Sequence, residues 1–176
     1  MSDNLKDWIK SIACAVVIAI AILQFIKPTI VSGSSMESTL HDRDYVLISR
    51  QSYKLFGGSP KLGDIIVFES DLLTDSGSQK LLIKRVIGVA GDTVSIYNGR
   101  VYLNGEMLVE TYTKDGFTAS DMDEITVPEG CVFVLGDNRQ NSADSRVSSI
   151  GCVPTENILG KVFIRLFPLS SICLFE

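Results

Sequence analysis

The sequence predicts a mainly β protein: an antiparallel sheet or barrel preceded by one N-terminal transmembrane helix. A long apolar run lies near the N-terminus, short β-branched segments bounded by turn residues follow it, and no long amphipathic helical period occurs after the run. The 176 residues are enough for one domain with its own core. We expect residues 1–7 to form a short cytoplasmic N-terminus, residues 8–27 the anchor, and residues 28–176 an extracytoplasmic β-rich domain.

The anchor is predicted from an apolar run that ends at Lys27-Pro28. Between Trp8 and Ile26 the only charge belongs to Lys10, close enough to the end for its ammonium to reach the interface. Such a helix spans about 28 Å, close to the hydrocarbon thickness of a bilayer. The alternative is a secretory signal cleaved near residues 31–33, but no clear A-x-A site follows the run. More lysines precede this helix than follow it closely, and this difference weakly favours a cytoplasmic N-terminus.

Strands are expected wherever β-branched or aromatic residues cluster between turn residues. These candidates are Tyr45–Ile48, Asp64–Phe68, Leu81–Val89, Val94–Tyr97, Val101–Leu103, Met107–Val109, Cys131–Leu135 and Val162–Leu166. The pairs Asn98-Gly99 and Asn104-Gly105 provide the positive φ angles of type I′ turns, which predicts a three-stranded meander. Residues 56–60 and 71–79 are expected to be loops, and residues 111–124 a mobile polar excursion.

Composition excludes several functional classes. The net charge of -5 and a pI near 4.9 argue against a nucleic-acid binder, which normally has a basic face. The four cysteines, Cys14, Cys131, Cys152 and Cys173, lack zinc-like spacing, and His41 is the one histidine, so no metal site is expected. Three cysteines lie beyond the anchor, and an odd number cannot all pair internally.

Ser35 is the candidate nucleophile. It lies in the stretch 32–40, just beyond the anchor, and the small residues Gly33 and Ser34 precede it. Small neighbours allow close approach of a substrate and leave backbone N–H groups free to stabilise an oxyanion. The alternative interpretation is a plain linker leaving the membrane.

A serine nucleophile needs a base, and a lysine can serve if burial keeps its amine neutral. Lys84 lies in the apolar segment 81–87 with apolar neighbours on its own strand face, whereas His41 lies in a polar turn. Arg85 cannot deprotonate and is therefore limited to pairing or binding. The alternative role for Lys84 is a charge that protects a sheet edge from aggregation.

A third group of polar residues, 136–146, follows an apolar strand. Asp144 could pair with Arg85 or Arg146, and a serine hydroxyl here could orient a lysine amine. The alternative is a merely solvated loop.

These segments, taken in chain order, resemble the sequence boxes of bacterial type I signal peptidases (leader peptidases). The matching residues are Ser35-Met36-x-x-Thr39-Leu40, Gly63–Phe68, Lys84–Gly88 followed by Gly91-Asp92, and Gly136–Arg146. With the anchor, the resemblance covers nearly the whole chain. The short chain and single anchor look like the Gram-positive form, and Lys84 stands where eukaryotic-type enzymes carry histidine.

The resemblance implies a largely β catalytic domain with Ser35 as nucleophile, Lys84 as general base and Ser142 holding the lysine amine. The supporting residues that it implies are Gly33 and Ser34 in the oxyanion region, Met36 in substrate binding, and Asp144, Arg146 and Arg85 in structural ion pairs. It also implies hydrolysis of preproteins after the signal peptide, at small-x-small sites, without metal or cofactor. The implied partners are signal peptides and the bilayer, and a monomer in the cytoplasmic membrane is expected.

Two departures from the family pattern concern the nucleophile. Glu37-Ser38 stands where the family usually shows x-Pro, and Gly33 stands where some members carry an oxyanion-stabilising serine. Two alternatives share these features: a Ser–Lys protease that trims one dedicated substrate, and a membrane-tethered β-module whose dyad has decayed. Substrate range distinguishes the dedicated-substrate protease from a signal peptidase. The intact Ser35, Lys84 and Ser142 argue against the decayed β-module.

Overall fold

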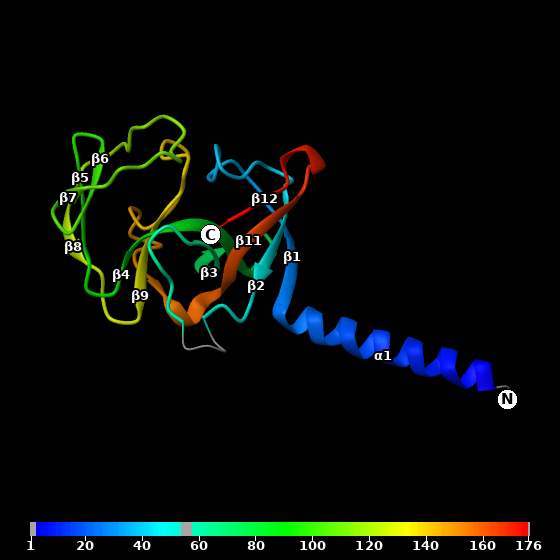
Figure 1. Ribbon diagram of the computed structural model, residues 1–176. Helices are drawn as coiled ribbons and strands as arrows, with labels where there is room; N and C mark the ends of the chain where they lie inside the picture. Colours follow the sequence, from blue (N-terminus) through cyan, green and yellow to red (C-terminus); the bar gives the residue numbers. More distant parts are fainter. Residues whose placement is uncertain (1–2, 54–57, 176) are drawn as a thin grey trace.

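An N-terminal helix leads directly into a β-rich body (Figure 1). The computed structural model describes residues 3–53 and 58–175. The helical elements are α1 (Asp3–Phe25) and the 3₁₀ turns η1 (Thr155–Asn157) and η2 (Leu169–Ser171). The strands are β1 (Ile26–Ile30), β2 (Tyr45–Ser49), β3 (Ile65–Leu73), β4 (Gln79–Val89), β5 (Thr93–Tyr97), β6 (Arg100–Leu103), β7 (Glu106–Met107), β8 (Met122–Thr126), β9 (Cys131–Leu135), β10 (Val153–Pro154), β11 (Ile158–Phe167) and β12 (Cys173–Leu174).

The strands form two sheets in which every pairing is antiparallel. The larger sheet has the order β1-β2-β11-β3-β4-β9-β10, with β12 paired to β11, and the smaller has the order β7-β6-β5-β8. Strand β1 lies at an edge, where Pro28 costs no ladder hydrogen bond on the open side. The smaller sheet lies on the side of the body away from α1 (Figure 1).

The mainly β prediction is confirmed. Each strand expected from the sequence overlaps an observed strand, and β3, β4 and β11 extend beyond the predicted bounds. Asn98 and Gly99 have φ of 48° and 73°, and Asn104 and Gly105 have φ of 53° and 79°. Both Asn-Gly pairs therefore adopt the left-handed backbone that a type I′ turn requires.

Other expectations need correction. The helix ends at Phe25, so Ile26 and Lys27 belong to β1 rather than to the anchor. The excursion 111–124 runs into β8 and is tied to the rest of the domain, for example by the Lys114 N–H, which donates to the Asp137 carbonyl at 3.1 Å. Of the expected loop 56–60, Phe56 and Gly57 lie outside the described residues.

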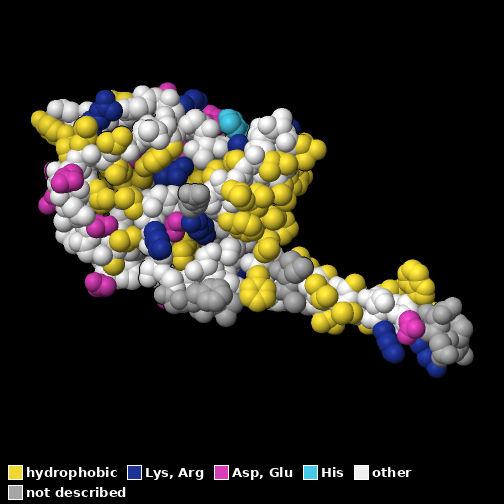
Figure 2. Space-filling model, in the orientation of Figure 1, with side chains coloured by type: hydrophobic (Ala, Val, Ile, Leu, Met, Phe, Trp, Pro, Cys, Tyr) yellow, Lys and Arg dark blue, Asp and Glu magenta, His cyan; other side chains and the backbone are white. Residues whose placement is uncertain are grey.

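Helix α1 has the length and composition of a membrane span. Residues Leu5–Phe25 have a mean hydropathy of 2.1, and none of this span is buried against the domain. Figure 2 shows its hydrophobic side chains exposed along the projecting helix. An exposed apolar helix of this length matches the predicted anchor.

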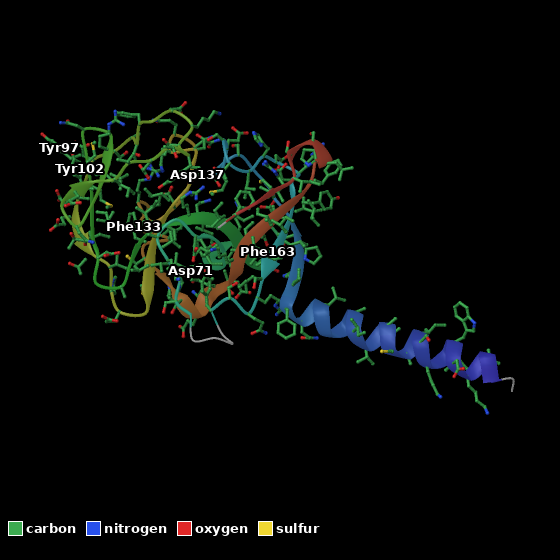
Figure 3. All side chains as sticks on the ribbon, in the orientation of Figure 1. Asp71, Tyr97, Tyr102, Phe133, Asp137 and Phe163 are labelled. Atoms are coloured by element: carbon green, nitrogen blue, oxygen red, sulfur yellow. The ribbon has the colours of Figure 1, made fainter. Side chains whose placement is uncertain are left out.

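The core divides into apolar clusters, of which some belong to the larger sheet and one joins the larger sheet to the smaller. One cluster joins β2, β3 and β11 to the turn after β1, where Met36 and Leu40 are 1% and 0% exposed. Another contains Phe133 and fills the space between the two sheets (Figure 3). Core packing therefore holds in place the turn between β1 and β2, residues 31–44, which carries the predicted nucleophile Ser35 and is called the nucleophile turn below.

The close approach of β11 to β2 depends on Gly160. A Cβ added there would lie 2.2 Å from the Ser49 carbonyl oxygen and 2.7 Å from Ile48 Cγ2, so the backbone would have to move. We expect Gly160→Ala to destabilise the domain by about 1–3 kcal/mol, measured by thermal unfolding in detergent. Gly130→Ala separates the two costs of adding a Cβ: it meets no atom within 4 Å, but its φ of 72° is one that alanine rarely adopts, so any loss of stability there reports backbone strain without a clash. Equal stability of Gly160→Ala and wild type would contradict this packing.

Candidate active site

Ser35 and Lys84 meet in the lining of an open groove. Ser35 lies in the turn after β1 and Lys84 in β4, and Lys84 Nζ is 2.7 Å from Ser35 Oγ. The same amine donates to the carbonyl of Ile83 at 2.9 Å. The distance between Ser35 Oγ and Lys84 Nζ suits direct proton transfer.

The environment of Lys84 disfavours its charged form. The residue is 2% exposed, and burial is the main cause that lowers the pKa of its amine to about 8. The charge of Asp144 raises this pKa, that of Lys80 lowers it, and that of Asp137 raises it. The balance makes the neutral amine accessible near physiological pH.

The loop 136–146 holds the nucleophile turn from its other side. Asn138 donates its backbone N–H to the Ser35 carbonyl at 3.0 Å and its side-chain amide to the Ser34 carbonyl at 3.0 Å. Asn141 Nδ2 donates to Ser34 Oγ at 2.8 Å. These contacts restrict the backbone of Ser35 while leaving its hydroxyl to Lys84.

Two separate ion pairs brace this loop, rather than one cluster. Arg85 binds Asp137 through two hydrogen bonds, Nε to Oδ1 at 2.9 Å and Nη2 to Oδ2 at 2.7 Å. Arg146 Nε donates to Asp144 Oδ1 at 2.8 Å, so Asp144 pairs with Arg146 and not with Arg85. Asp137 and Asp144 are both 0% exposed, and Figure 3 labels Asp137 at the start of the loop.

Ser142 lies beside the nucleophile turn without a hydrogen bond to Lys84. Its Oγ is buried and has no hydrogen-bond partner among the described residues. A Cβ added at Gly136 would lie 2.2 Å from Ser142 Oγ and 2.5 Å from the Ser35 carbonyl oxygen, which places both groups against this glycine. The orienting role of Ser142 therefore stays a prediction.

The other expected site residues line or support the groove. The Gly33 N–H donates to Asp42 Oδ1 at 2.8 Å, which takes it away from a substrate oxyanion. Met36 lines the groove, and its side chain also packs in the hydrophobic core. His41, the alternative base, has a side chain that is 61% exposed and lies 4.0 Å from Asp44.

The excursion contributes contacts to the nucleophile turn that sequence reasoning missed. Ser38 Oγ donates to the Tyr112 carbonyl at 2.8 Å, and Lys114 Nζ donates to a Glu37 carboxylate oxygen at 2.9 Å. The Tyr112 ring lies 4.0 Å from the guanidinium carbon of Arg85. These contacts fix the turn at the position where the family pattern has proline.

A buried ion pair lies next to these contacts and joins the loop 136–146 to Glu110. Arg139, 2% exposed, binds the carboxylate of Glu110 and donates from Nη1 to Thr118 Oγ1 at 2.8 Å. The only sequence signal for the pair is an acidic residue just before the excursion and an arginine in the loop 136–146.

The groove itself has a volume of about 460 Å³. Residues 29–36 form one wall and residues 80–84 the other, with Val67, Asn141 and Ala143 completing the lining. Both walls end at the Ser35–Lys84 contact. The shape suits an extended chain lying along the strand edges.

Metal-ligating side chains do not gather in the described part of the chain. Within residues 3–53 and 58–175, no group of three or more His, Cys, Asp or Glu side chains is placed to hold an ion. The four cysteines are free.

Comparisons with known proteins identify the family. A probable signal peptidase I-2 of Synechocystis sp. is 39% identical over 165 residues, 93% of this chain and 73% of that protein. The signal peptidase I of Bacillus amyloliquefaciens is 36% identical over 176 residues, 94% of this chain and 90% of that protein. A crystal structure of a signal peptidase I from Enterococcus faecalis V583 is 33% identical and covers 59% of this chain and 97% of that one, with a TM-score of 0.48.

The family described as signal peptidase, peptidase S26, matches residues 5–167. That match includes α1, the nucleophile turn, Lys84 and the loop 136–146. The chain therefore belongs to the signal peptidase family, peptidase S26, as a bacterial type I member.

Proposed function

We propose that this serine peptidase removes signal peptides from exported preproteins with Ser35 as nucleophile and Lys84 as general base. The observation that carries the proposal is the 2.7 Å contact between Ser35 Oγ and a buried lysine amine whose pKa is lowered to about 8. Family membership supplies the reaction class, peptide hydrolysis.

The reaction proceeds through an acyl-enzyme. Neutral Lys84 accepts the Ser35 proton as Oγ attacks the scissile carbonyl, and the resulting ammonium gives that proton to the leaving amine as the peptide C–N bond breaks. Lys84, neutral again, takes a proton from water, which attacks the ester and releases the signal peptide. The proton then returns to Ser35 Oγ, so the cycle consumes one water and no other reactant.

The oxyanion of the tetrahedral intermediate needs donors. We assign the Ser35 backbone N–H to this role, since the Gly33 N–H is engaged by Asp42. The rigid hold of Asn138 on the Ser35 and Ser34 carbonyls supports a preorganised N–H at this position.

The groove suits a substrate emerging from a membrane. Helix α1 leads directly into β1, and the chain from Ile26 to Ser35 spans at most about 30 Å, so an α1 embedded in the bilayer keeps Ser35 near its surface. Small side chains are expected at the first and third positions before the cut, as the family resemblance implies. We place α1 in the cytoplasmic membrane with the catalytic domain outside and the chain as a monomer.

A dedicated-substrate protease would share this dyad and differ in substrate range alone. A decayed binding module would have no reason to keep a buried, hydrogen-bonded Lys84 beside Ser35. The catalytic proposal therefore takes precedence over the binding-module alternative.

Removal of either dyad group should abolish cleavage. We expect Ser35→Ala and Lys84→Met each to lower kcat by about a thousandfold or more, because nucleophile and base act as a unit. The measurement is cleavage of a preprotein with a small-x-small site in detergent. Lys84→Met keeps the side-chain volume and removes a buried amine, so its melting temperature should be no lower than that of wild type. Activity retained in Lys84→Met would mean that another group is the base.

The rate should rise with pH. Only the neutral amine accepts a proton, so we expect kcat/KM to increase about tenfold per pH unit below about 8 and to level off above it. A pH–rate profile with signal peptide substrate tests this. A limb centred near pH 6.5 that disappears in His41→Ala would contradict the role of Lys84.

Ser142 can be tested separately from folding. Its Oγ makes no hydrogen bond to any residue that the structure describes, so Ser142→Ala should leave the free energy of unfolding unchanged or slightly raised. If the hydroxyl orients Lys84 during turnover, kcat falls by about tenfold or more. Ser145→Ala is the matched control, since Ser145 Oγ accepts the Val134 N–H at 2.9 Å and should affect stability rather than kcat. Full activity of Ser142→Ala would remove Ser142 from the mechanism.

A further inference from the structure

Lys80 stands on the groove wall with no assigned role. It is exposed in β4, and by the period of two its side chain shares a strand face with Leu82 and Lys84. Among the described residues that line the groove, Lys80 and Lys84 are the charged ones. The groove thus presents a cation, and no carboxylate, to a bound chain.

The strand pairings show which end of the groove Lys80 occupies. The antiparallel steps β1–β2, β2–β11, β11–β3 and β3–β4 make β1 and β4 run in the same direction. Both strands run toward the dyad, so Thr29 and Lys80 lie at the same end of the groove. Helix α1 precedes β1 directly, which makes this the anchor end.

The part of a substrate that occupies this end follows from the proposed function, on which the present inference rests. A signal peptide is held by the membrane on the N-terminal side of the cut, so its last residues lie between the anchor end and Ser35. Lys80 precedes Lys84 by about 13 Å along the strand, since an extended chain rises about 3.3 Å per residue. With the residue before the cut beside Lys84, the fifth residue before the cut lies beside Lys80.

We propose that Lys80 is a specificity-determining residue that selects the charge of the signal peptide near the fifth position before the cleavage site. A carboxylate there pairs with the Lys80 ammonium, and a lysine or arginine there is repelled. The charge of Lys80 also acts on Lys84, whose pKa it lowers.

The size of the effect is set by solvent exposure. An exposed ion pair changes an equilibrium by a small factor, and salt weakens it. We expect a carboxylate to be favoured over a lysine by about two- to five-fold in kcat/KM at low salt.

The test uses three peptides that carry the same small-x-small site and differ at the fifth position before it, with Asp, Asn or Lys. Full-length enzyme in neutral detergent should cleave the Asp peptide about two- to five-fold more efficiently than the Lys peptide. Lys80→Gln should bring this ratio to about one, and Lys80→Glu should invert it. Lys61→Gln, an exposed lysine outside the groove lining, should leave the ratio as in wild type.

Three results would overturn the proposal. An unchanged Asp-to-Lys ratio in Lys80→Gln would remove Lys80 from specificity. An equal loss on all three peptides, with that ratio unchanged, would limit Lys80 to its effect on the pKa of Lys84. If the Asp-to-Lys preference appears only in anionic vesicles and not in neutral detergent, the ligand of Lys80 is a lipid headgroup. Failure of wild type to cleave any peptide, while it also leaves a preprotein intact, would instead reject the proposed function.

Discussion

The proposed reaction depends on a Lys84 amine that loses its proton readily and lies 2.7 Å from Ser35 Oγ. Burial alone would suffice in an apolar site, but two carboxylates lie near enough to raise the pKa of Lys84. Each of them is engaged by a guanidinium: Asp137 by Arg85 and Asp144 by Arg146. Besides bracing the loop, these ion pairs limit the rise in the pKa of Lys84, because unpaired carboxylates would favour the lysine ammonium more strongly. The charge of Lys80 at the groove wall acts in the same direction as burial.

Positioning of the two reacting groups is divided between rigid and irregular parts of the chain. Lys84 lies in β4, a central strand of the larger sheet paired on both sides, so its position is fixed by the ladder. Ser35 lies in a turn and is held by long-range contacts instead: Met36 packs into the core and Asn138 binds the Ser35 carbonyl. The excursion adds the Ser38–Tyr112 contact on the outer side. Contacts from three distant segments thus replace local rigidity in the turn.

Much of this arrangement could be predicted from sequence, for identifiable reasons. Strands with β-branched runs and Asn-Gly turns carry strong local signals, and Lys84 stands out among the lysines because its neighbours are apolar. Strand β1 was missed because its residues, including Lys27 and Pro28, read as the close of the apolar run. The packed excursion was missed because its contacts, such as the ion pair of Lys114 with Glu37, join residues far apart in the sequence and leave no local pattern. The choice of Arg146 as partner for Asp144 likewise required the tertiary structure.

Direct titration of the Lys84 amine tests whether it loses its proton near pH 8, as the proposed reaction requires. The side-chain ¹³Cε resonance of Lys84, assigned by comparison with Lys84→Met, can be followed by NMR in detergent as pH is raised. We expect a midpoint of about 8, well below the ordinary value for a lysine amine. A midpoint at 10 or above, close to the ordinary value for lysine, would contradict a neutral lysine base.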